Sequence, residues 1–235
     1  MTELTQCFIL HQRSYRETSL LLDIFSKNYG RVSLIAKGVR QKKRSKIGLY
    51  QLYQPLLVAW MGKGELLTLT TAETHAPRYI LKAESALCGL YINELMVKLL
   101  PLHESEPELF NAYQYALESL QAVDNTQLAL RLFEKRLLTH LGYGLVLDRE
   151  FETGQLIDEQ QQYYYQADAG LARWYPGLKQ PAISGRSLRH LLDESGFDSQ
   201  SLSEIKQLMR TVIHFYLGGK PLQSRQLFTE LHRLK

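Results

Sequence analysis

The first 75 or so residues are divided into five short apolar or alternating runs, each bounded by Gly, Pro, Asn or charged residues. The runs cover 7–11, 19–25, 31–36, 55–61 and 65–74. Runs of this length and alternation are typical of β-strands. Asn28–Gly30 and Gly62–Gly64 supply glycines for two of the turns. The pattern therefore predicts a small five-stranded barrel.

From Leu81 onward the apolar residues recur at three- and four-residue spacing, as on the buried face of a helix. We expect the first helix to end before Pro101. A second helix is expected over 106–121. A third is expected over 127–141, with glycine in its usual C-terminal role over Gly142–Gly144.

Residues 145–182 lose this periodicity, which predicts a small irregular or β-rich insert. Helices are expected again over 185–194 and from near Ser224. Between them, Ser201 and Glu204 have the Ser-x-x-Glu spacing of a capping box. The pattern predicts that this helix runs to Leu217, before two glycines.

These elements predict an α+β, multi-domain fold. Residues 1–80 are expected to form a barrel of the oligonucleotide-binding (OB) type, and residues 81–235 a helical domain that carries the insert at about 145–182. The charge follows the same division: residues 1–80 hold 12 Lys/Arg against 5 Asp/Glu, giving +7, whereas residues 81–235 hold 16 against 19, giving −3. The barrel is thus the basic part of the chain.

Several function classes lack support in the sequence. Phosphate-loop, Gly-x-Ser-x-Gly and His-Glu-x-x-His motifs are missing, and no two histidines have metal-ligand spacing. Cys7 and Cys88 are too far apart in sequence to suggest a metal site, and we expect free buried thiols in a reducing cytosol. The N-terminus has no signal-peptide core, and no stretch has the roughly 20 apolar residues that span a bilayer. We therefore expect a cytoplasmic protein without catalytic residues, metal or other cofactor.

The positive signal is the expected connection between the third and fourth strands, in which six of the ten positions over 37–46 are cationic. An OB barrel binds single strands by combining such cations with aromatic faces on which bases stack. Further cations near the same turns extend the expected DNA-binding set, which is Arg13, Arg16, Arg31, Lys37, Arg40, Lys42, Lys43, Arg44 and Lys46. The possible stacking surfaces are Tyr15, Tyr29, Tyr50 and Tyr53.

Four segments also resemble a known family. They are FILHQRSYRETSLLLDIFSKNYGRVSLIAKGVR, GLYINELMVKLL, RLFEKRLLTHLGYG and LGGKPLQSRQLF. In this order, over nearly the whole chain, they are similar to the RecO family of bacterial recombination mediators. The resemblance implies an OB barrel joined to a helical domain, without catalytic turnover. It also implies binding of single- and double-stranded DNA, annealing of complementary strands, contact with the single-strand binding protein SSB, and action with RecR to load RecA at the nucleoid.

Many members of this family carry a four-cysteine zinc site in the segment matching about 145–180, whereas this chain has no cysteine there. The zinc is therefore not carried over. An acidic, apolar SSB tail needs cations beside an apolar pocket. The expected receiving residues are Arg131, Lys220 and Arg225, with Lys135 and Arg136 as weaker candidates.

Two other functions stay open at this point. The chain could be a protein-interaction adaptor, in which the helical domain docks partners and the basic loop is merely solvated. A nuclease is less well supported, because no carboxylate cluster suited to Mg²⁺ is visible.

Overall fold

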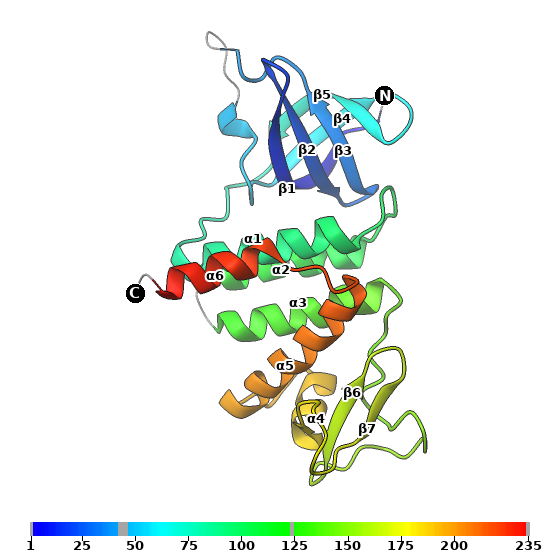
Figure 1. Cartoon of the computed structure of the whole chain (residues 1–235). Helices are drawn as coiled ribbons and strands as arrows, with labels where there is room; N and C mark the ends of the chain where they lie inside the picture. Colours follow the sequence, from blue (N-terminus) through cyan, green and yellow to red (C-terminus); the bar gives the residue numbers. More distant parts are fainter. Residues whose placement is uncertain (1, 42–46, 123–124, 234–235) are drawn as a thin grey trace. The chain divides into compact units, whose positions relative to one another are not determined.

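The computed structural model describes residues 2–41, 47–122 and 125–233. Five strands close into a barrel with the order β1-β2-β3-β5-β4 (Figure 1). The pairs are antiparallel except for β3 with β5. The predicted OB-type barrel is confirmed, and its strands are β1 (Thr5–Tyr15), β2 (Ser19–Ser26), β3 (Gly30–Ala36), β4 (Leu56–Met61) and β5 (Leu66–Thr74).

The barrel interior is filled by alternate residues of each strand. In β3 the burial strictly alternates, so Val32 and Leu34 are fully enclosed while Ser33 and Ile35 face outward. Each such aliphatic side chain contributes roughly 1.5–3 kcal/mol on burial. Tyr50 belongs to the same core, whereas Tyr53 is buried elsewhere, with its hydroxyl donating to the Ala86 carbonyl at 3.5 Å.

Gly30 shows why the β2–β3 turn needs glycine. Its φ is +64°, a left-handed value, and a Cβ there would lie 1.7 Å from the main-chain oxygen of Glu104. No other residue fits this site without moving the backbone. The predicted glycine turns at Gly30 and at Gly62 are both confirmed.

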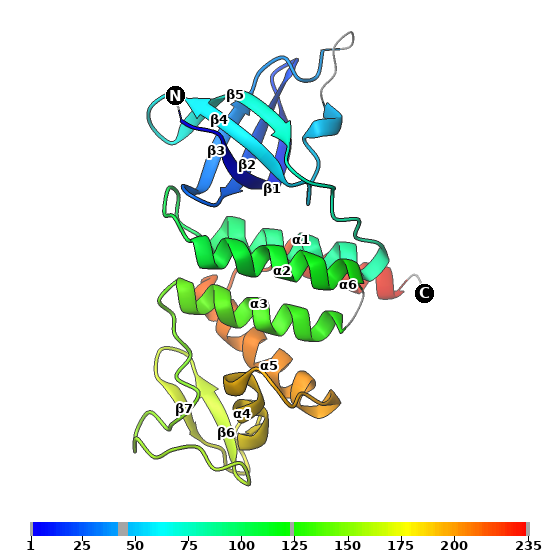
Figure 2. The ribbon, with the colours of Figure 1, turned by 180° about the vertical axis from the view of Figure 1, so that it is seen from behind.

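Three helices belong to the same compact unit as the barrel, which comprises residues 1–124 together with 222–235. They are α1 (Ala83–Leu99), α2 (Pro107–Ala122) and α6 (Gln223–Arg233). Figure 1 shows one end of the barrel over α1 and α2, with the β1–β2 hairpin at the other end. Figure 2, which views the chain from behind, shows β4 and β5 in front.

The second compact unit covers residues 125–221 and holds the predicted insert. Its elements are α3 (Thr126–His140), β6 (Gln162–Gln166), β7 (Gly170–Arg173), β8 (Ile183–Ser184), α4 (Gly185–Asp193) and α5 (Ser199–Tyr216). The insert is a three-stranded sheet in the order β7-β6-β8. Next to it, buried Glu150 accepts hydrogen bonds from Arg173 Nε and Thr153 Oγ, both at 2.8 Å.

These units divide the chain differently from the predicted boundary at residue 80. The first two helices after the barrel, and the last helix of the chain, group with the barrel. The helix boundaries agree with the predictions to within a few residues.

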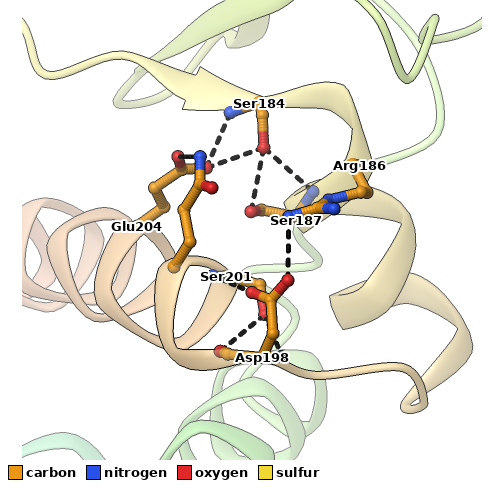
Figure 3. Close-up of polar contacts among 7 residues, drawn as sticks. Ser184, Arg186, Ser187, Asp198, Ser201 and Glu204 are labelled. Carbon is orange, nitrogen blue, oxygen red and sulfur yellow. Dashed lines mark hydrogen bonds and ion pairs between the residues drawn. The ribbon is translucent and has the colours of Figure 1, made fainter.

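The expected capping box at Ser201 and Glu204 is wrong. Helix α5 is capped by Asp198, whose Oδ1 accepts from the Ser201 main-chain N–H at 2.7 Å, while Ser201 Oγ accepts from the Asp198 N–H at 2.8 Å (Figure 3). Glu204 instead accepts from the main-chain N–H and hydroxyl of Ser184, the N-cap of α4. The carboxylate that sequence spacing assigns to its own helix therefore supports the start of another.

Candidate nucleic-acid interface

Arg16, Glu17 and Thr18 form the turn of the β1–β2 hairpin. They lie between Tyr15 and Ser19, the last pair of the ladder. Arg16 has a φ of +50°, an uncommon value for a residue other than glycine. Its guanidinium carbon lies 5.3 Å from the centre of the Tyr15 ring, within cation–π range. The turn thus presents a cation and an aromatic face together.

The chain leaving β3 is attached to this hairpin. Lys37 follows the last residue of β3 and is exposed, and Gly38 takes a left-handed φ of +70°. Two residues later the Arg40 main-chain N–H donates to the Thr18 carbonyl at 2.9 Å. This bond brings the cations of the β3 exit to the same end of the barrel as Arg16.

Between the hairpin and the β3 exit lies an open hollow of about 880 Å³. Its lining combines an aromatic ring, an aliphatic side chain, cations and uncharged polar groups. The residues are Tyr15, Arg16, Glu17, Thr18, Ser19, Ile35, Lys37, Gly38 and Gln41. Glu17 is the one carboxylate among these lining residues, so the hollow is bordered mainly by positive charge.

Arg13 extends this surface along β1. It lies two residues before Tyr15 and is exposed, so both side chains are on the outer face of the barrel. Across the sheet Arg13 is paired with Leu21, which is in turn paired with Ile35 of the hollow. Arg13, Arg16, Lys37 and Arg40 therefore form one group, which we call the hairpin cations.

Arg31 does not belong to this group. It lies at the start of β3, where its Nε donates to the Leu100 carbonyl at 2.9 Å and one terminal nitrogen is 3.9 Å from Asp23. Its side chain is only 17% exposed. Arg31 thus fixes the barrel to the end of α1, and we leave it out of the proposed interface. Lys42, Lys43, Arg44 and Lys46 lie outside the described residues.

The four tyrosines have different roles. Tyr50 and Tyr53 are buried, and burial raises the pKa of both hydroxyls. Tyr29 is partly exposed and makes an edge-to-face contact with Trp60, with the two ring centres 5.1 Å apart. Tyr15 is the one of these four that lines the hollow. Of the four possible stacking surfaces, Tyr50 and Tyr53 are therefore excluded, because they are core residues.

The residues expected to bind the acidic SSB tail also differ in burial and in their partners. Arg131 is buried and its terminal nitrogen pairs with Glu134 at 2.9 Å, so it does not present its charge at the surface. Lys135 and Arg136 both pair with Glu194. Arg225 lies over the Tyr91 ring at 5.7 Å in the barrel unit. Lys220 is exposed, in the other unit, four residues beyond the end of α5.

Within the described ranges, no three His, Cys, Asp or Glu side chains form a group suited to a metal ion. Cys7 and Cys88 are buried thiols that form no disulfide, as predicted. None of the helices in that part of the chain is long and apolar enough to cross a membrane.

Comparison with known proteins agrees with this architecture. The family described as "Recombination protein O N terminal" matches residues 1–78, and "Recombination protein O C terminal" matches residues 82–226. This chain belongs to the RecO family. Its similarity to the DNA repair protein RecO of Nitrosococcus oceani is 42% identity over 232 residues, covering 98% of this chain and 94% of that protein. The RecO relatives of Methylococcus capsulatus and Coxiella burnetii are 42% and 40% identical, and the matches cover 96% and 95% of this chain and 92% and 96% of those proteins.

Sequence reasoning missed the residues that complete the hollow, namely Glu17, Thr18, Ser19, Ile35, Gly38 and Gln41. None of them is cationic or aromatic, so residue type gives no signal for nucleic-acid binding. These residues could have been found only from the pairing of the strands. A hairpin that closes at Tyr15 and Ser19 places Thr18 beside the end of β3. The charge run from 37 onward was found because it is local in sequence.

Proposed function

We propose that this protein is a non-enzymatic DNA-binding mediator of recombinational repair, consistent with its membership of the RecO family. It binds single- and double-stranded DNA at the hairpin end of the barrel and anneals complementary strands. With RecR, it helps to load RecA onto single-stranded DNA covered by SSB. The observation that carries the proposal is the grouping of Arg13, Arg16, Lys37 and Arg40 at one end of the barrel, where Arg16 and Lys37 line the open hollow.

The chemistry of this group suits phosphate. Arg and Lys neutralise backbone charge and release counterions, which makes binding steeply salt-dependent and largely independent of sequence. Annealing needs binding that is independent of sequence, because any complementary pair must be held without selection of particular bases. Neither step requires bond cleavage or a bound metal.

The test is fluorescence anisotropy of a labelled single-stranded oligonucleotide at several salt concentrations. The test variant is Arg16→Glu with Lys37→Glu, and its matched control is Lys63→Glu with Lys82→Glu. All four residues are exposed and in the barrel unit, and both variants change the net charge equally. Lys63 lies in the β4–β5 turn and Lys82 precedes α1, so neither touches the hollow.

We expect the hairpin variant to lose at least tenfold in affinity and the control to stay within about threefold, since only the former removes phosphate contacts. Equal losses would mean that overall charge, not the hairpin end, determines binding. If the unchanged protein does not bind at low salt, the adaptor function replaces this proposal. In an annealing assay with complementary strands, the hairpin variant should likewise be less active than the control variant.

For the SSB partner we propose a contact at Lys220. This exposed cation lies four residues beyond the end of α5, and Phe215, five residues before it in sequence, is 41% exposed, so a positive charge and an apolar ring occur near the same end of the helix. An acidic, apolar peptide requires that combination. A labelled peptide of the SSB C-terminus should bind several-fold more weakly to Lys220→Glu than to Lys179→Glu, an exposed control in the same unit. Equal binding by both variants would contradict the placement.

A further inference from the structure

We infer that the hollow beside the β1–β2 hairpin receives a single unstacked nucleobase, stacked on Tyr15, and that this subsite lets the protein prefer single-stranded DNA over duplex. The inference rests on the proposed function, because it assumes that DNA reaches this end of the barrel. It adds what part of the nucleic acid enters the hollow and which residue recognises it.

The lining of the hollow suits a base rather than a phosphate. Its volume of about 880 Å³, within the range of roughly 300–1,000 Å³ typical of small-ligand sites, is large enough to admit a base. The lining includes half-buried Ile35 and the Tyr15 ring, which offer apolar contact. Arg16 and Lys37 border it too, but the Glu17 carboxylate beside them would repel a phosphate group that entered the hollow. A neutral, flat group meets no such repulsion and can contact both Ile35 and Tyr15.

Tyr15 is placed for stacking. It is the last residue of β1, so its position is set by the ladder pair with Ser19 rather than by a free loop. Arg16 lies over the ring at 5.3 Å, and a guanidinium can stack on a base as well as on an aromatic ring. Tyr15 and Arg16 together therefore form an aromatic and cationic platform of the kind that binds bases without regard to their identity.

The other lining groups supply polar partners for the edge of a base. Thr18 and Ser19 carry hydroxyls, Gln41 carries an amide, and each of these side chains both donates and accepts. Such groups can pair with any base edge. The subsite should therefore show little sequence preference, as an annealing protein requires.

This arrangement discriminates between strand states because a duplex hides its base faces. In B-form DNA each base is stacked between neighbours and shows only its edges in the grooves, whereas a single strand can turn a base outward at little cost. A duplex can still meet Arg13 and Arg40 through its phosphates. Tyr15 should thus contribute to the binding of single strands and little to the binding of duplex.

The test compares Tyr15→Ala with Tyr15→Phe, using a labelled 20-residue oligothymidine and a blunt duplex of the same length at one salt concentration. We expect Tyr15→Ala to weaken single-strand binding at least about fivefold, the lower end of the loss for removal of one stacking ring. Duplex affinity should change by less than twofold. Tyr15→Phe should keep wild-type affinity, because it keeps the ring. Tyr175→Ala, at a 59% exposed tyrosine of the other unit, is the control for loss of a surface aromatic.

A second measurement uses only the unchanged protein and Tyr15→Phe. The probe is a single strand that contains one 2-aminopurine base. The fluorescence of this base should change on binding, as the base leaves its neighbours and stacks on the ring. Pairing the probe with a complementary strand should abolish this change.

The failures of the two proposals are distinguishable. Absence of binding to either probe by the wild-type protein would refute the proposed function. Normal wild-type binding with equal losses on both probes in Tyr15→Ala, or with no loss on either, would overturn only the base subsite. An unchanged 2-aminopurine signal on saturation with wild-type protein would overturn it as well.

Discussion

The side-chain amide of Asn93 on α1 donates to the Leu10 carbonyl of β1 at 2.9 Å, and thereby joins helix to barrel. Its oxygen accepts from the Tyr113 hydroxyl of α2 at 2.8 Å. Asn93 is 3% exposed, so these bonds form in a nearly dry setting beside the ring of Phe8. A single side chain thus connects three elements of the barrel unit.

Replacing Asn93 by Ala should destabilise the protein by roughly 1–3 kcal/mol, because the buried Leu10 carbonyl loses its donor and the Tyr113 hydroxyl loses this acceptor. Tyr113→Phe removes only one of the two bonds and should cost less, roughly 0.5–1.5 kcal/mol. Urea unfolding followed by circular dichroism measures both. An Asn93→Ala midpoint equal to that of the wild type would show that the bridge adds nothing.

Gly30→Ala should be strongly destabilising. Alanine pays roughly 1–2 kcal/mol for the left-handed backbone, and its Cβ would overlap the Glu104 main-chain oxygen, so the β2–β3 turn must also move. The matched control is Gly48→Ala, where no atom outside the adjacent residues and the local backbone lies within 4 Å of the added carbon and the φ is not left-handed. Thermal unfolding should show a Tm several degrees lower for the first variant and nearly unchanged for the second. Similar Tm values for both would contradict the close approach to Glu104.

The barrel could be predicted from sequence because its signals are local: short alternating runs and glycines at left-handed positions such as Gly30. The start of α5 could not, since Asp198, Ser201 and Glu204 all suit a cap and only tertiary structure assigns Glu204 to Ser184. The same limit applies to the candidate interface. The hairpin cations were predictable as charges, but Tyr53 and Tyr15 look alike in sequence, and packing buries one and exposes the other to the hollow.

Arg131 and Glu134 provide a test of a buried ion pair on α3. Their side chains are 5% and 1% exposed, and they meet at 2.9 Å. Arg131→Met should cost roughly 3–5 kcal/mol, because Glu134 is left buried without this partner, whereas Arg131→Met with Glu134→Leu should recover most of the loss. Chemical denaturation of the single and double variants measures this coupling. Equal stability of the single variant and the wild type would show that the pair is dispensable.

Glu94 on α1 should make the attachment of α6 dependent on pH. Partial burial by itself would raise the Glu94 pKa, but hydrogen bonds from Ser224, Lys98 and Gln223 outweigh it and hold the pKa below its ordinary value of 4.5. A lowered pKa in the folded state gives stability that is fully present above about pH 4.5 and is lost as the pH falls through the folded value. Wild-type Tm should therefore fall on acidification below pH 5.

The matched variant for this effect is Glu94→Gln, which keeps the shape and removes the titration. Its Tm at neutral pH should be lower than that of the wild type, and its further decrease in acid should be smaller. Hydrogen exchange at the Gln223 and Ser224 amides, which both donate to Glu94, reports the attachment directly. Acid-induced loss of protection that is identical in the two proteins would exclude Glu94 as the titrating group.

Lys37 allows the phosphate contacts of the hairpin end to be counted. It is exposed at the exit of β3 and borders the hollow, so its ammonium group is free to approach a DNA backbone. Each phosphate neutralised on a single strand contributes about −0.7 to the slope of log affinity against log salt. Lys37→Ala should therefore flatten the slope by about 0.7, while Lys179→Ala, an exposed lysine of the other unit, should leave it unchanged. Titration of an oligothymidine at four or more salt concentrations gives both slopes, and a slope equal to that of the wild type in Lys37→Ala would remove this residue from the interface even if affinity fell.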